Sequence, residues 1–167
     1  VEMIRFKWAF FPVFLWPILA VAHPQDMGKL DVTTSGNELF FVLEVIPEVA
    51  SLVSGLDRKT LNDAQATLHA QVLLHTTLAE NSLHSSSGDC TWGEAQAQPS
   101  GAEIRISAKA TCPSLTDGWT LQLPFLHRAP RGFELLVKIR NGPEQQELIA
   151  SSSSDSLASA PRTQDSK

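Results

Sequence analysis

The stretch ELFFVLEVI, residues 38–46, decides the fold of this chain. Its Leu, Phe, Val and Ile side chains occupy odd and even positions alike, which is typical of a strand in the interior of a sheet. Gly36-Asn37 just before it suits a tight hairpin turn, and LDVT at residues 30–33 supplies the preceding strand. The sequence therefore predicts a hairpin with a central second strand, ended by Pro47.

A helical period replaces the strand pattern between residues 48 and 79. Thr60-x-x-Asp63 resembles a capping box that begins a helix. The apolar residues that then recur at helical spacing are Leu61, Ala64, Leu68 and Val72. We expect one or two helices here, packed against the sheet.

Alternation with a period of two returns in the second half. The apolar members of the first such strand are Ile104, Ile106, Ala108 and Ala110. Further strands are expected around residues 119–123, 133–139 and 147–150, with a turn at 141–143. Strands dominate without βαβ alternation, so we predict a mainly β, sandwich-like antiparallel fold with a short helical insertion.

The domain boundaries follow from composition. Residues 23–150 are long enough for a single core, and we assign them to one β-rich domain. Ser151 to Lys167 contains four consecutive serines, one leucine and no aromatic residue. Such a segment buries too little apolar surface to offset its ordering entropy, so we predict a disordered tail over 151–167.

The N-terminal residues 1–22 have the order of an export signal. Arg5 and Lys7 follow Met3, an apolar run covers residues 8–19, and Ala20-Val21-Ala22 offers a small-x-small cleavage site. The run is shorter than the roughly 20 residues that cross a bilayer, so we expect cleavage near Ala22 rather than a retained anchor. The mature chain is then expected in the periplasm or secreted, without a stable transmembrane anchor.

Charge and cysteine content narrow the function classes further. The chain has a net charge of −5, which disfavours nucleic acid and anionic membranes as partners. Two cysteines in an exported chain predict one disulfide, Cys90–Cys112. A free thiol pair and half of a metal site are the alternatives, but no Cys-x-x-Cys spacing supports a metal site.

His23 is the first candidate for a metal ligand. Cleavage after Ala22 would make it the first residue, so that its α-amine and imidazole could chelate copper or nickel together. Gln25 stands where the common amino-terminal motif has a histidine, so further ligands must come from elsewhere. The pool comprises Asp26, His69, His75, His84 and His127. The alternative is that His23 is merely tolerated after the cleavage site.

No enzyme motif is present in the sequence. There is no Gly-x-Ser-x-Gly elbow, glycine-rich phosphate loop or calcium loop. His127 lies in a proline-bounded loop, residues 124–132, together with Arg128 and Arg131, where solvated charge is the common explanation. We therefore expect no catalytic activity.

Four segments together resemble a known family. They are HPQDMG (23–28), GDCTWG (88–93), ATCP (110–113), and LPFL (123–126) through FELLVK (133–138). They are similar to the exported domain that precedes the membrane part of HupE/UreJ-type bacterial proteins, and more loosely to ZrgA-like periplasmic proteins. The resemblance implies a Gram-negative envelope protein linked to nickel, cobalt or zinc. Here only the serine-rich tail follows, so transport by this chain alone is not expected.

Two functions remain in competition. The first is a non-enzymatic periplasmic accessory domain that handles a divalent transition metal with a membrane partner, using His23. The second is a metal-independent module that binds an envelope protein through a sheet edge or the 124–132 loop. A copper oxidase using His23 ranks third, because it would need a second histidine nearby.

Overall fold

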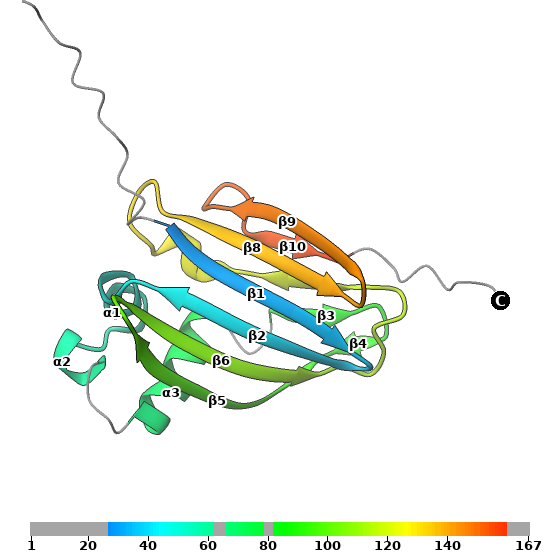
Figure 1. The fold of residues 1–167 in the computed structure, drawn as a ribbon, viewed down its shortest axis with the longest axis horizontal. Helices are drawn as coiled ribbons and strands as arrows, with labels where there is room; N and C mark the ends of the chain where they lie inside the picture. Colours follow the sequence, from blue (N-terminus) through cyan, green and yellow to red (C-terminus); the bar gives the residue numbers. More distant parts are fainter. Residues whose placement is uncertain (1–26, 62–65, 79–81, 160–167) are drawn as a thin grey trace, which may run out of the picture.

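The structure is a computed structural model that describes residues 27–61, 66–78 and 82–159, with the side chains of 66–69 excepted. Strands dominate it, and short helices gather at one end (Figure 1). Its strands are β1 (Met27–Ser35), β2 (Glu38–Val45), β3 (Leu83–Ser85), β4 (Gly88–Asp89), β5 (Thr91–Ser100), β6 (Glu103–Thr111), β7 (Trp119–Gln122), β8 (Glu134–Asn141), β9 (Glu144–Ala150) and β10 (Ser156–Ala158). Its helices are α1 (Pro47–Ser54), α2 (Arg58–Leu61), α3 (Ala66–Thr77) and the 3-10 helix η2 (Pro124–His127).

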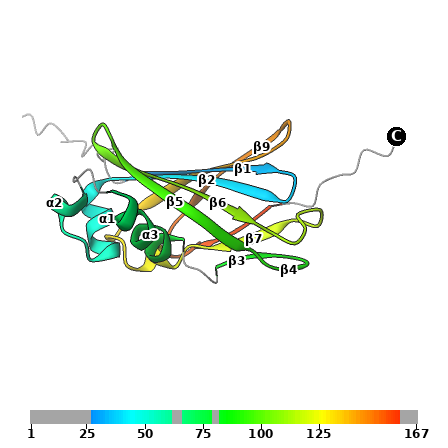
Figure 2. The ribbon, with the colours of Figure 1, turned by 90° about the horizontal axis from the view of Figure 1, so that it is seen from below.

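The strands form two sheets that face each other as a sandwich. A six-stranded sheet has the order β5-β6-β2-β1-β8-β9, and a four-stranded sheet has the order β10-β7-β3-β4. Figure 2 shows the two layers edge-on, with the helices beside the smaller sheet. All strand pairs are antiparallel except β1 and β8, which run parallel. The predicted mainly β, sandwich-like fold is confirmed.

The first hairpin forms as its sequence predicts. Gly36 has a φ of 58°, a left-handed conformation that glycine adopts without strain, and the β1–β2 register closes at Ser35 and Glu38. β2 lies inside the six-stranded sheet, flanked by β1 and β6. Only its inner face is covered, however, since Phe40 on the outer face is 41% exposed.

The core lies between the two sheets. Alternate residues of the long strands point inward, which gives each strand one buried and one open face. The largest fully buried side chains include Leu30, Phe41, Leu43, Ile104, Ile106, Leu121 and Phe125.

The disulfide Cys90–Cys112 is present, as predicted. Cys90 lies where the chain passes from β4 in the smaller sheet to β5 in the larger, and Cys112 follows β6, from which the chain returns to β7. Both cysteines are buried, and the amide of Cys112 donates a hydrogen bond to the carbonyl of Asn37. The bond therefore ties together the two crossings between the sheets at this end.

The predicted helical segment contains α1, α2 and α3. Pro47 ends the strand and also begins α1, where its missing N–H costs nothing. The side chains that α3 buries are Ala70, Leu73, Leu74 and Thr77. Val72, which the helical spacing counted with the buried side, is 36% exposed, so that assignment is wrong. Asp63 of the predicted capping box lies outside the described residues.

The prediction of a disordered tail over 151–167 is wrong for residues 151–159. Ser151 and Ser154 form a bridge that turns the chain after β9, and β10 then pairs with β7. Leu157 of β10 is 1% exposed and lies opposite Leu121. One buried leucine is enough to hold this segment in place, because it completes a core that the other strands already form. The domain therefore extends beyond residue 150. Residues 160–167 lie outside the described part of the chain.

Candidate functional site

The predicted metal ligands His23 and Asp26 lie outside the described residues. The side chain of His69 also does. Within 27–61, 66–78 and 82–159, no group of three or more His, Cys, Asp or Glu side chains could hold a metal ion. The described side chains thus supply no complete metal site of their own.

Two of the predicted histidines instead pair with single carboxylates. His84 and Asp89 are partners across the β3–β4 hairpin, with 2.7 Å between Nδ1 and Oδ1. His127 of η2 lies 2.9 Å from Asp155, measured from Nε2 to Oδ2. Each histidine is about half exposed. No sequence signal pointed to Asp155, which approaches His127 because the segment predicted as a tail turns at residues 151–154 and pairs with β7.

His84 also lines a shallow pocket of about 240 Å³ with Asp117 and Ser86, among others. The Ser86 hydroxyl donates a 3.4 Å hydrogen bond to Asp117. This arrangement offers one imidazole and one additional carboxylate, which is fewer than the donor set of a stable metal site.

The 124–132 loop fixes the helices to the sheets. Phe125 and Leu126 are buried. The Arg128 guanidinium donates hydrogen bonds to the carbonyls of Val53, near the end of α1, and Thr76, near the end of α3. Cations are favourable beside the negative ends of helix dipoles. Arg128 therefore links the ends of α1 and α3 to this loop, and its side chain is exposed to solvent, as predicted, like that of Arg131.

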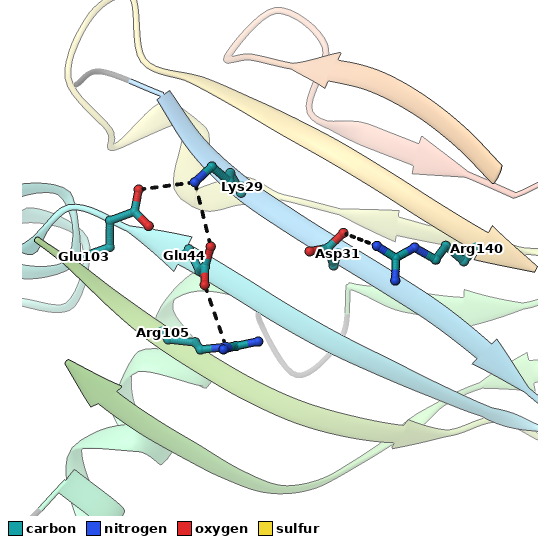
Figure 3. A network of polar contacts seen from close by, with 6 residues as sticks. All are labelled: Lys29, Asp31, Glu44, Glu103, Arg105 and Arg140. Carbon is teal, nitrogen blue, oxygen red and sulfur yellow. Dashed lines mark ion pairs between the residues drawn. The ribbon is translucent and has the colours of Figure 1, made fainter. Parts of the chain in front are cut away.

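The outer face of the six-stranded sheet carries a network of ion pairs (Figure 3). Lys29 lies 3.9 Å from Glu44 and 3.7 Å from Glu103, and Arg105 lies 3.7 Å from Glu44. On the neighbouring strand β8, the guanidinium of Arg140 lies 3.6 Å from one carboxylate oxygen of Asp31 in β1. These groups neutralise one another in water, so this face offers no large field to a charged partner.

The four sheet edges differ in how open they are. β4 and β10 are two and three residues long. β5 is long but irregular, because its register shifts between Trp92 and Ala95, it contains Pro99, and α3 packs against it. Bulges, prolines and covering elements are the usual protections of an edge strand.

Among the described residues, β9 has no bulge, no proline and no partner strand other than β8, although it does carry the charged side chains Glu144 and Glu147. Residues 144–150 pair with β8 in one continuous register and contain no proline. Ile149 is 52% exposed on the outer face, opposite Leu136 of β8. We call the side of β9 that faces away from β8 the β9 edge. In a β-strand, every second residue directs its N–H and C=O to such an edge, where another strand can pair with them.

A pocket of about 350 Å³ adjoins the β9 edge. We call it the hairpin-end pocket, and its lining residues are Ile139, Asn141, Glu144, Gln145, Gln146 and Ser159. The register pairs Ile139 with Gln146 and Asn141 with Glu144, so these four share the inner face at the end of the β8–β9 hairpin. Gln146 lies on the inner face yet is exposed, and Ser159, which follows β10, lines the same pocket.

The described residues thus form a disulfide-linked β-sandwich in which β9 lies at one edge of the larger sheet. No protein-family model matches the chain, and no curated protein matches it significantly. In the described residues, no helix has the length and apolar character required to span a bilayer.

Proposed function

We propose that this chain is a non-enzymatic accessory domain of the bacterial periplasm that docks onto an envelope partner through the β9 edge. The observation that carries the proposal is the regular, proline-free register of β9 with β8. Addition of a partner strand to an exposed edge is a common recognition mode, in which main-chain hydrogen bonds supply affinity and alternate side chains supply specificity. Export is supported by the order of residues 1–22 and by the disulfide.

The β9 edge is a better docking surface than the 124–132 loop. Arg128, Phe125 and Leu126 of that loop are engaged within the domain. Ile149, in contrast, is 52% exposed, and a strand added beside β9 would cover part of its surface.

Sedimentation with envelope membranes of the producing organism tests this docking. The mature domain should co-sediment in a saturable manner, and Ile149→Lys should lower the bound amount at least about fivefold, because a lysine at an edge opposes strand addition. Leu52→Lys is the matched control, since Leu52 is 58% exposed on α1, away from β9. Equal binding by both variants would contradict docking at the β9 edge.

Metal handling from the N-terminus is the second candidate function. Gly28 lies against Phe133, and the Phe133 ring is 6.4 Å from that of Phe125, two residues before His127. The start of β1 therefore lies near η2, and we propose that His23, five residues before Gly28, binds the metal together with His127. The Nε2 contact to Asp155 leaves Nδ1 of His127 for a metal, with the carboxylate as an outer partner.

Calorimetric titration tests this second function. The mature protein, beginning at His23 with a free α-amine, is titrated with Cu(II), Ni(II), Co(II) and Zn(II). Submicromolar binding that both an N-terminal extension and His127→Ala abolish is the expected result. Absence of binding would remove metal handling and leave docking at the β9 edge as it stands.

A further inference from the structure

We infer that the ligand of the β9 edge is an extended basic peptide segment whose Lys or Arg side chain enters the hairpin-end pocket. The inference rests on the proposed docking and specifies its partner chemistry. The ligand must fit two features at once. Its backbone must pair with the strand edge, and one of its side chains must fit the pocket beside that edge.

The pocket lies where an added strand would place a side chain. Glu144 and Gln146 are alternate residues of β9 on its inner face, and both line the pocket. A strand paired with β9 continues the same alternation, so every second side chain of the partner points toward this inner side. The side chains between them lie on the outer face, beside Ile149.

The lining of the pocket suits a long cationic side chain. Ile139 is 3% exposed and forms an apolar floor, while amide, hydroxyl and carboxylate groups surround it. Lys and Arg have this same division, with an aliphatic stem and a charged head.

Glu144 supplies the charge complementarity. Its carboxylate forms no ion pair with any described residue, whereas Glu147 on the outer face is 3.2 Å from Lys138. The whole chain is acidic, with a net charge of −5, which also favours a basic partner.

A second copy of this chain fits the edge less well. Antiparallel pairing of two β9 strands centred on Glu147 would set two copies of that carboxylate directly opposite each other, and like charges in that position are destabilising. The same carboxylates would favour a strand that carries Lys or Arg.

Nuclear magnetic resonance titration of the full mature protein tests the inference. The probe is a short acetylated peptide of alternating Thr and Val with one central Lys, and its comparison peptide has Gln in place of Lys. The Lys peptide should shift the amide resonances of residues 144–150 and Ser159, and it should bind at least about threefold more tightly than the Gln peptide, as expected for one exposed ion pair.

Matched variants identify the responsible carboxylate. Glu144→Gln should remove the preference for the Lys peptide, whereas Glu94→Gln, the same change at an exposed position on the opposite edge strand β5, should retain it. Both positions are exposed, so both variants should unfold at the same temperature as the parent.

Each outcome decides the inference. Equal binding of the Lys and Gln peptides at residues 144–150 would overturn the cationic specificity and leave docking at the β9 edge intact. The inference would be overturned if amide resonances shift only outside residues 144–150, if none shift, or if the protein dimerises through β9 without peptide. Membrane sedimentation would then test docking at the β9 edge independently.

Discussion

Arg128 joins three segments that are distant in the sequence. Its guanidinium donates to the carbonyls of Val53 and Thr76, so one side chain satisfies the ends of two helices and fixes them to the loop after η2. Sequence reasoning could not detect this role, because the acceptors are backbone atoms 75 and 52 residues away.

Replacing Arg128 should therefore destabilise the domain. Arg128→Ala is expected to lower the free energy of unfolding by about 1 kcal/mol, since it removes two charge-assisted hydrogen bonds at a partly solvated site. Urea unfolding followed by circular dichroism measures this. Arg131→Ala, an exposed arginine in the same loop, should change the free energy by less than about 0.5 kcal/mol. Equal effects of the two variants would refute the role of Arg128.

At the scale of the elements, the disulfide is expected to make a measurable contribution to the free energy of unfolding. It links the two points at which the chain passes between the sheets, 22 residues apart. The double variant Cys90→Ser, Cys112→Ser is expected to lose roughly 3 kcal/mol of unfolding free energy, because its unfolded chain is less constrained. Thermal unfolding of oxidised and reduced parent protein provides the same comparison without mutation. An unchanged midpoint would mean that the crossings hold without the bond.

β10 provides the second prediction at this scale. Leu157→Ala should cost about 2–4 kcal/mol, because the removed side chain is 1% exposed in the core. Ser156→Ala, at the exposed neighbouring position, should cost less than about 0.5 kcal/mol. Denaturant unfolding of both variants measures these losses of unfolding free energy. A Leu157→Ala protein as stable as its parent would restore the disordered tail that the serine-rich sequence suggested.

The sequence predicted the elements whose pattern is strong. The 38–46 stretch, the 104–110 alternation and the turn at 141–143 all carry clear period-two or turn signals, and strands lie there. β3 and β10 were missed, because β3 lies in a short polar segment with several serines and β10 has one leucine. In both, pairing with a neighbouring strand outweighs weak local preference.

At the scale of the whole molecule, the candidate site was harder to predict from the sequence than the fold was. A sheet edge was foreseen as a docking surface, but which strand is open depends on the order of the sheet, and the parallel β1–β8 pair that leaves β9 outermost has no local signal. The hairpin-end pocket likewise combines residues of the β8–β9 hairpin with Ser159 after β10, which no local sequence pattern brings together.

Photo-crosslinking in intact cells is a direct test of docking at the β9 edge. Benzoylphenylalanine replaces either Gln145 of β9 or Gln98 of β5, two exposed glutamines on the opposite edge strands of one sheet. Docking at the β9 edge predicts a crosslinked envelope protein from position 145, none from position 98, and loss of the adduct when Ile149→Lys is added. An adduct from position 98 alone, or one from 145 that persists with Ile149→Lys, would contradict it.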